Sequence, residues 1–401
     1  MASLDLPKIR PLGGQTVEHD GHTFVQFDDP IGLASTTVLV PIELFHWVVR
    51  RFDGRTPLTE IQAGLIRETG RLMTTAELMA IVDQLDRALI LDGPCFAAFR
   101  ANYHDQQTRP AAHAGRSYAG TERALRAQLG QFFADAKGAG SPNNGAAVNG
   151  QRAANGRVRG VLSPHIDFFR GGPTYTWSYK ELIENSDADV FIILGVAHQF
   201  CKRRFALTRK DFETPLGLAR TDRAYVDRLA ALAGAHLFDD ELAHRPEHSI
   251  EFQVVFLQYL LGGRRDFSIV PILVGSFHDL MDAGRDPIAD PEVRRFVDAL
   301  HAAESASGKT VAYIGGIDLA HVGREFGDPD LLDPSTLDQV RQFDAAMLDR
   351  ASAADPAGWF HKAAEVANRW RICGLAATYT MLHAMGPAQG RLLQYDQAVN
   401  P

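Results

Sequence analysis

Four apolar runs rich in Val and Ile constrain the fold of this chain more than any other feature. They cover residues 158–164, 190–197, 267–274 and 311–317, and each ends in a small cluster of polar residues. Short apolar runs bounded by Gly and Pro are typical of buried strands in a parallel sheet. In open α/β sheets, ligands bind just beyond the carboxyl ends of the strands. We therefore expect one functional edge that carries the polar residues after three of these runs: His165, His198, Asp318 and His321.

A coincidence of unrelated histidines in polar loops is the alternative explanation. The chain contains 15 His residues, so a single His after one strand carries little weight. Three of the four candidate strands are followed by a polar cluster that contains His, and this recurrence favours a shared site.

The composition bounds the class of protein. The 401 residues suit two domains, and a hydrophobic content of 45% is sufficient for their cores. The net charge of -8 and the lack of a dense basic run argue against a nucleic-acid partner. No apolar run of about 18 residues and no secretory signal pattern are present, so no membrane span is expected. The three cysteines are too few for a disulfide framework, and a cytoplasmic location is expected.

Residues 1–100 are expected to form a smaller first domain. Residues 23–29 and 34–40 have the composition of strands, and helices are predicted over 41–52, 59–69 and 75–89. Thr74 and Glu77 have the spacing of a capping box at the start of the third helix. A short closing strand and turn are predicted over 88–93. This order of elements predicts a winged-helix-like α+β module.

Residues 110–395 alternate predicted strands with helices, as an α/β domain does. Besides the four apolar runs, helical patterns cover residues 122–133, 175–185, 223–233, 249–261, 338–349 and 374–384. Residues 137–156 are rich in Gly, Ala and Asn and lack periodicity, so they predict a flexible loop within this domain.

His165, His198 and Cys373 form the first set of candidate metal ligands. Neutral imidazole and thiolate are good ligands for Zn, Fe(II), Co and Cu. Cys373 precedes a predicted helix, whose dipole would favour the thiolate. Packing of Cys373 as a small apolar residue is the alternative.

Glu247, His248 and Glu251 form a second set at the predicted start of a helix. His248 and Glu251 are three residues apart and share a face. A His held by a carboxylate serves as an acid/base or supports a metal ligand. Helix capping by the two glutamates is the alternative.

Asp318 and His321 form a third set beyond the last apolar run. The preceding Gly315-Gly316 lets a ligand approach the backbone closely. An Asp at this place can orient an imidazole or bind a metal.

Seven short motifs occur in the order found in the MEMO family, whose members are known as protein B of the AmmeMemoRadiSam set. The chain resembles this family over roughly residues 110–390. The motifs are His113-Ala-Gly-Arg-Ser-Tyr, Ser163-Pro-His, Leu194-Gly-Val-Ala-His, Glu247-His-Ser-Ile-Glu, Pro271-Ile-Leu-Val-Gly, Asp318-Leu-Ala-His and Ile372-Cys-Gly. This family is similar to class III extradiol dioxygenases, which use non-haem Fe(II). The resemblance implies an extradiol dioxygenase-like α/β sandwich and a single divalent metal, with Fe(II) expected and Cu or Zn as alternatives.

The resemblance also implies the roles of the site residues. His165, His198 and Cys373 match the metal-site residues, and His321, oriented by Asp318, is the candidate acid/base together with His248. Glu247 and Glu251 are expected to support the site or to bind substrate. The residues after His165 depart from the family pattern, which places Asp167 and Arg170 where they would change the ligand of the pocket.

The first domain resembles PqqD-like domains, which recognise the leader peptides of ribosomally made natural products. The resemblance rests on Phe52-Asp-Gly, Thr59-Glu-Ile and the segment 85–93. It implies a peptide ligand bound at a free edge of a three-stranded sheet, with that edge facing the mouth of the metal pocket or able to swing toward it. A structural or dimerising appendage is the alternative, and the acidic third helix argues against DNA binding.

Taken together, these features predict a non-haem iron-dependent oxidoreductase that acts on a peptide or a small aromatic substrate, with a radical SAM enzyme as a partner. The alternative function is non-enzymatic binding of a metal or a peptide on a vestigial dioxygenase scaffold.

Overall fold

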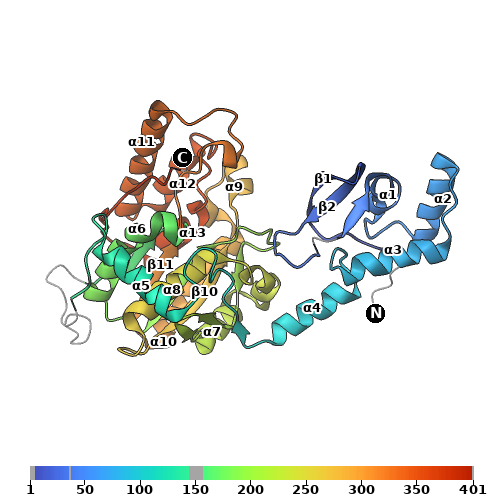
Figure 1. Ribbon diagram of the computed structural model, residues 1–401. Coiled ribbons are helices and arrows are strands. Elements are labelled where there is room, and N and C mark those ends of the chain that lie inside the picture. Colours follow the sequence, from blue (N-terminus) through green and yellow to red (C-terminus); the bar gives the residue numbers. More distant parts are fainter. Residues whose placement is uncertain (1–4, 36–37, 144–156, 400–401) are drawn as a thin grey trace. The chain divides into compact units, whose positions relative to one another are not determined.

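The structure is a computed structural model that describes residues 5–35, 38–143 and 157–399 (Figure 1). The chain divides into two compact units, residues 1–106 and residues 107–401. Helices and sheets occur in both units, so the expected mixed α/β class is confirmed. Within the described ranges, no helix is both long enough and apolar enough to cross a membrane.

The first unit is an antiparallel three-stranded sheet followed by helices. Its strands are β1 (Gly13–His19), β2 (His22–Asp28) and β3 (Leu39–Pro41), in the order β1-β2-β3. Its helices are α1 (Ile42–Trp47), α2 (Leu58–Thr69), α3 (Thr75–Arg87) and α4 (Pro94–Asp105), with a 3-10 turn at Val49–Arg51. The capping box of Thr74 and Glu77 begins α3, as the sequence predicts.

Three elements of this unit differ from the sequence-based expectation. β1 is exposed along most of its length, so it lacks the apolar alternation that would reveal it. Residues 88–93 form no strand, and Leu91 makes an isolated bridge to Ile9 instead. Residues 94–105 form α4, with Pro94 in its first turn. Residues 36–37 of the expected second strand lie outside the described residues. The PqqD-like character and a sheet edge facing the metal pocket stay predictions.

The second unit is built on a five-stranded sheet with the order β5-β11-β6-β10-β7. The strands are β5 (Gly160–Ser163), β6 (Val190–Val196), β7 (Phe205–Leu207), β10 (Ser268–Val274) and β11 (Val311–Gly316). Only β7 among these five runs antiparallel to its neighbour. The four apolar runs of the sequence are therefore the four parallel strands. A smaller sheet contains β4 (Thr108–Arg109), β8 (Asp211–Thr214) and β9 (Gly217–Ala219).

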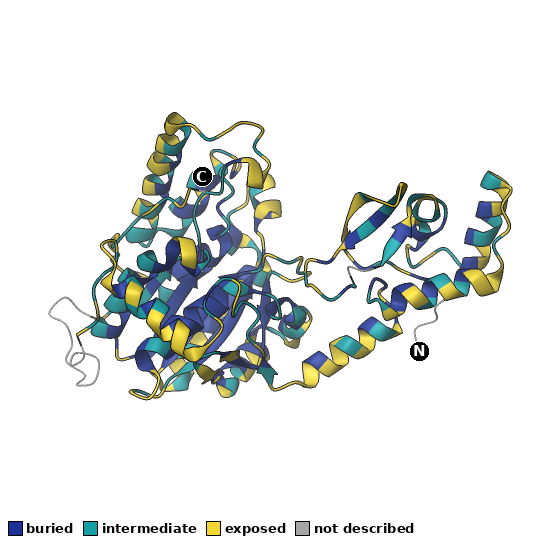
Figure 2. Cartoon of the chain, in the orientation of Figure 1, coloured by how far each residue is buried: buried dark blue, intermediate teal, exposed yellow. Residues whose placement is uncertain are grey.

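Helices cover both faces of the five-stranded sheet (Figure 1). On one face lie α6 (Phe168–Asn185) and α8 (His248–Leu261), with α5 (Glu122–Ala134) against both. On the other face lie α7 (Arg223–Ala233) and α13 (Leu375–Met385), with α10 (Pro291–Ser307) against both. The remaining helices are α9 (His278–Asp282), α11 (Pro334–Ser352) and α12 (Pro356–Ala364), with 3-10 turns at Ala235–Phe238, Glu241–His244, Pro287–Ala289 and Arg324–Phe326. Figure 2 shows the buried residues gathered on the sheet and on the helix sides that face it.

α6 begins at Phe168, although the sequence pattern predicts a helix only from Tyr175. The Gly171-Gly172-Pro173 segment interrupts the apolar periodicity and hides the first turns. Asp167 caps the helix through its side chain. A Cβ at Gly172 would overlap the ring of Phe132 in α5, so glycine here permits the close approach of the two helices.

The predicted flexible loop lies only partly within the described residues. Residues 144–156 lie outside the described residues. Residues 137–143 pack along α6, where Trp177 Nε1 donates a hydrogen bond to the carbonyl oxygen of Lys137 at 2.8 Å. Lys180 Nζ donates to the carbonyl oxygen of Ala139 at 2.9 Å.

The close packing of α8 on the sheet leads to a stability prediction. A Cβ at Gly316, at the end of β11, would overlap the carbonyl oxygen of Ser249 in α8. Gly316→Ala should therefore lower the free energy of unfolding by about 1–3 kcal/mol, the usual range for overpacking. Urea unfolding of the full chain measures the change.

The matched control is Gly130→Ala in the interior of α5. A Cβ there meets only the Tyr259 hydroxyl, at an ordinary contact distance of 3.4 Å. Since Ala is a better helix former than Gly, this variant should keep or raise the stability, by up to about 1 kcal/mol. Equal effects of the two substitutions would contradict the packing argument.

Candidate metal centre

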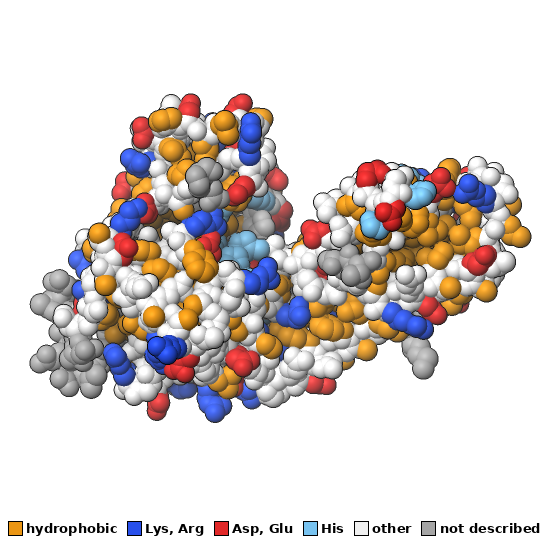
Figure 3. Space-filling view, in the orientation of Figure 1, with side chains coloured by type: hydrophobic (Ala, Val, Ile, Leu, Met, Phe, Trp, Pro, Cys, Tyr) orange, Lys and Arg blue, Asp and Glu red, His pale blue; other side chains and the backbone are white. Residues whose placement is uncertain are grey.

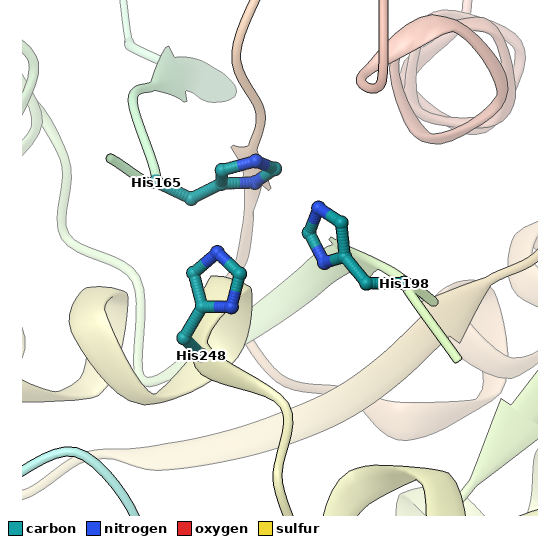
Figure 4. A group of neighbouring side chains, drawn as sticks. All are labelled: His165, His198 and His248. Atoms are coloured by element: carbon teal, nitrogen blue, oxygen red, sulfur yellow. The ribbon is translucent and has the colours of Figure 1, made fainter. Parts of the chain in front are cut away.

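Three histidines converge where the strands end (Figure 4). His165 follows β5, His198 follows β6, and His248 is the first residue of α8. One ring nitrogen of each lies within 4.8 Å of the others. The ring centroids are 4.9 Å apart for His165 and His198, 5.0 Å for His165 and His248, and 4.7 Å for His198 and His248. The strand-end pattern thus brings two of these residues together, and α8 adds the third.

His165 is buried and is held from two directions. Its Nδ1 lies 2.9 Å from the carbonyl oxygen of Gly316, which can only accept, so Nδ1 carries the proton. Its backbone N–H donates to Asp318 Oδ1 at 2.9 Å. Nε2 is therefore the unprotonated ring nitrogen, and it lies 3.2 Å from Cys373 Sγ and 3.7 Å from Asp318 Oδ2.

Glu247 holds the other two histidines. His198 Nδ1 lies 3.1 Å from both carboxylate oxygens of Glu247, and His248 Nδ1 lies 3.3 Å from Oε1. The same carboxylate accepts the backbone N–H groups of His198, His248 and Ser249, and so caps α8. Glu247 therefore has both of the roles that the sequence offered as alternatives, because it caps α8 and it contacts an imidazole. Ligating histidines commonly donate their second N–H to a carboxylate or a carbonyl in this way.

The protonation of the cluster follows from burial and from Glu247. Burial lowers the pKa of His165, and it lowers the pKa of His248 to about 3. Burial also disfavours charge on His198, but the hydrogen bond and the negative charge of Glu247 outweigh it and raise the pKa of His198. Burial alone would raise the pKa of Glu247, whereas the hydrogen bond from His198 and the positive charge of that imidazole lower the pKa of Glu247. Two imidazoles are thus neutral at neutral pH, which is the form that binds a metal.

Cys373 lies beside His165 in a half-buried position. Its Sγ is 3.6 Å from the carbonyl oxygen of Asp318 as well as 3.2 Å from His165 Nε2. Burial raises the pKa of the Cys373 thiol well above its ordinary value. Desolvation of the charge thus opposes the thiolate that the dipole of α13 would favour. Ligation by Cys373 stays a prediction.

His321 is held by the backbone, not by Asp318 as expected. Its Nδ1 lies 3.0 Å from the carbonyl oxygen of Leu319 and 3.2 Å from that of Arg371, so Nδ1 is the donor. Asp318 instead accepts the backbone N–H of His165. Asp318 and His321 lie on the irregular segment after β11, and their side chains contact different neighbours. Nε2 of His321 is left for a ligand of the cavity.

Glu251 supports the fold around the site. Its buried carboxylate pairs with Arg109 and accepts the hydroxyl of Tyr118 at 2.5 Å and the backbone N–H groups of Ala112 and His113 at 2.9 and 3.0 Å. Burial opposes its charge, but Arg109 holds the pKa of Glu251 below its ordinary value.

Sequence reasoning missed Arg109, since an Arg in a two-residue strand has no distinguishing pattern. Its Nη2 donates to the carbonyl oxygen of Glu247 at 2.7 Å, and so anchors the residue that holds His198. The ring of His113, for which no role was predicted, packs against His248 with centroids 5.6 Å apart.

The three histidines line a cavity of about 1710 Å³. Asp318, His321, Cys373, Asp167 and Arg170 also line it, so all the sequence-predicted site residues except the two glutamates border one space. Asp167 and Arg170 form an ion pair at its wall. Figure 3 shows His side chains at the surface in a hollow of the second unit.

Comparison with known proteins gives consistent matches that cover this unit, and two of them extend into the first unit. A family model described as "Memo-like protein" matches residues 109–400. A "MEMO1 family protein" of Aquifex aeolicus is 28% identical over 397 residues, which cover 97% of this chain and 94% of that protein. A MEMO1 family protein of Methanopyrus kandleri is 32% identical over 59% of this chain and 75% of its own length. One from Thermus thermophilus is 28% identical over 86% of this chain and 94% of its own length.

The contacts of Glu247 predict its effect on metal binding. Glu247→Gln should weaken binding of a divalent metal about 10- to 100-fold, because the neutral amide no longer fixes the donor tautomer of His198 and His248. Competition with a fluorescent chelator measures the change, with Zn²⁺ as the test ion.

Asp222→Asn is the matched control. Asp222 is also a buried helix cap, at the start of α7, and it accepts from Tyr225 N at 3.1 Å. The control should lose a similar amount of stability and keep its metal affinity. Unchanged affinity in Glu247→Gln would refute the role of Glu247.

Proposed function

Because the chain belongs to the Memo-like protein family, we propose that its second unit is a metal-dependent oxidoreductase with a single divalent ion at the histidine cluster. The observation that carries the proposal is the convergence of three imidazoles, each with Nδ1 at a carboxylate or a carbonyl and with Nε2 left over. Imidazole nitrogens at this spacing fit a first-row transition metal, and they do not fit Mg²⁺ or Ca²⁺, which prefer oxygen ligands.

His165 and His198 belong to every ligand set that we consider. The third donor is His248 by geometry, since its ring nitrogen meets the other two. The family resemblance instead points to Cys373, which touches His165. We propose the three histidines as the resting set, because burial keeps Cys373 protonated until an ion is near. Asp318, with Oδ2 at 3.7 Å from His165 Nε2, is an additional oxygen donor within reach.

Fe(II) is the ion that we expect, with Cu and Zn as the alternatives, and Fe(II) would supply one-electron chemistry with dioxygen. The chain's own residues would orient the substrate and move protons. His321 presents Nε2 to the cavity while its Nδ1 donates to carbonyl oxygens. This arrangement suits a group that takes a proton from the substrate and returns it. Arg170 and Asp167 at the cavity wall are our candidates for substrate contacts, which a peptide or a small aromatic molecule would satisfy.

A peptide ligand for the first unit and a radical SAM enzyme as a partner are separate proposals. The support for the former is the three-stranded sheet with β1 and β3 at its edges, since extended peptides add to such edges. Fluorescence titration of the full chain with short peptides encoded beside the gene tests the peptide proposal. If no saturable binding is seen, the first unit is a structural or dimerising appendage.

Metal analysis tests the oxidoreductase proposal. Protein purified without oxygen should hold about one Fe per chain, and His165→Ala, His198→Ala and His248→Ala should each lose most of it. The exposed His22→Ala, in the first unit, is the control and should keep its metal. With Co²⁺ as the probe ion, a thiolate-to-metal charge-transfer band that vanishes in Cys373→Ser would show that Cys373 is a ligand.

A second prediction separates catalysis from ligation. His321→Ala should retain most of the metal while it loses metal-dependent oxygen consumption by about 100-fold or more, the usual contribution of a general acid or base. If this variant loses metal as completely as His165→Ala, His321 is a ligand and the assigned role is wrong. A loaded protein that consumes no oxygen with any substrate would favour the non-enzymatic alternative.

A further inference from the structure

Residues 387–399 follow α13 and form neither a helix nor a strand. Every one of them lines the cavity that the histidines line, together with residues of β5, α6 and α11. A segment of the chain itself therefore makes one wall of this space. The contacts of that wall decide whether it is a fixed part of the fold or a part that can move.

On one side, two ion pairs hold the segment. Arg391 Nη2 donates to Glu181 Oε2 in α6 at 2.7 Å. Lys137 Nζ, in the segment after α5, donates to Asp396 Oδ2 at 2.7 Å. Both cations are exposed, so water competes for them and each pair shifts an equilibrium by roughly a factor of 5 or less.

On the other side, the segment contacts α11. The hydroxyl of Tyr395 donates to Asp344 Oδ2 at 2.8 Å, and the backbone N–H of Gly390 donates to the carbonyl oxygen of Ser352 at 2.7 Å. The buried Asp344 also faces the backbone N–H of Ala320, in the segment after β11 that carries the site residues. Residues 387–399 thus bridge α6 and α11 across the cavity.

Apolar packing contributes little to holding the segment. As far as the structure describes the two apolar cores of the second unit, no residue of 387–399 belongs to them, and Leu392 and Val399 are exposed. One backbone hydrogen bond, that of Gly390, joins the segment to the rest of the described chain. Parts of a protein with few buried apolar contacts open at a much lower free energy than the core. The segment can therefore leave its place while the second unit stays folded.

Two glycines set the path of the segment. Gly386, where the chain leaves α13, has φ 68° and ψ −164°, a conformation that is essentially restricted to glycine. Gly390 lies against α11, where a Cβ would come within 3.0 Å of Ser352 Cα. A larger residue at Gly386 would turn the segment in another direction, and one at Gly390 would push it off α11.

We propose that residues 387–399 are a releasable strap, hinged at Gly386, that closes one side of the cavity and opens to admit a ligand. The chemistry of that ligand rests on the proposed function, whereas release of the strap needs no metal.

Limited proteolysis of the full chain measures release. Trypsin cleaves segments that are locally unfolded, so cleavage after Arg391 under native conditions reports the open strap. The rate of this cleavage should depend only weakly on urea, because release exposes little surface, whereas cleavage within the core helices should follow global unfolding.

A pair of glycine variants tests the hinge. Gly386→Ala should raise the rate of cleavage after Arg391 about 10-fold or more, because the strain at this position is relieved when the strap leaves. Gly308→Ala, at the end of α10, is the matched control. Gly308 has φ 65° and ψ 9°, which other residues can adopt, and a Cβ at either glycine meets no atom within 4 Å. The control should leave the rate after Arg391 unchanged.

A pair of glutamate variants tests the contact with α6. Glu181→Gln removes the charge that holds Arg391 and should raise the rate of cleavage about 2- to 5-fold. Glu122→Gln removes the exposed ion pair with Arg126 within α5, away from the strap, and should have no effect.

Oxidation of Met385 gives an independent readout of the cavity. Met385 lines it, and its sulfur lies against β5, 2.6 Å from where a Cβ at Gly160 would be. In Glu181→Gln, dilute peroxide should convert Met385 to the sulfoxide faster by the same factor as trypsin cleaves after Arg391. The half-buried Met79 of the first unit is the internal reference in each sample.

Cleavage after Arg391 that requires global unfolding, in the unchanged chain and in Gly386→Ala alike, would show that the strap is a fixed part of the fold and overturn the proposal. Faster cleavage with unchanged oxidation of Met385 would overturn the role of the strap in access. Both readouts are taken on metal-free and Zn²⁺-loaded chain, so a failure to bind Zn²⁺ counts against the proposed function alone.

Discussion

The histidine cluster depends on one buried carboxylate. Glu247 receives backbone N–H groups from the loop after β6 and from the first turn of α8, and it faces the Nδ1 atoms of His198 and His248. A buried charge is tolerated only when it is compensated, and here the compensation comes from the elements that carry the ligands. Folding and site geometry are thereby coupled, because α8 cannot be capped by Glu247 without bringing His248 beside His198.

The sheet provides the frame for this arrangement. β5, β6 and β11 end at one edge because they are parallel, and the residues after them meet there. Glycines at strand ends let α8 approach closely, since a Cβ at Gly195 or Gly316 would collide with Ser249. Arg109 and Glu251 then join a distant segment to α8 through a buried ion pair with hydrogen-bonded surroundings. The histidines are therefore held by packing as well as by hydrogen bonds.

The electrostatics of the site distinguishes its two candidate third ligands. An imidazole loses little on burial because its neutral form is also the ligating form. A thiol must ionise to bind, and at Cys373 burial opposes that step. A metal ion would supply the positive charge that reverses this balance, so Cys373 is an additional soft donor beside His165.

The sequence by itself determined the parallel strands and the place of the site. Continuous Val and Ile runs can be buried on both faces only in a covered sheet, and the polar residues that follow such runs lie at its edge, which placed His165, His198, Asp318 and His321 in one region. Local signals also gave the Thr74 cap and the bounds of α7. They failed for α6, where Gly and Pro interrupt the period, and for β1, which is exposed.

Tertiary structure alone decided the partners within that region. No local signal shows that His248 lies beside the other two histidines. Nor does one show that Asp318 bonds to His165, where the sequence predicted a contact with His321. Both contacts depend on how α8 and the loop after β11 pack on the sheet. Arg109 and Glu251 are far apart in the chain and pair only when the fold is complete. Burial, which sets the protonation of Cys373 and His248, is likewise a property of the folded chain, since desolvation by distant residues cannot be read from neighbours in the sequence.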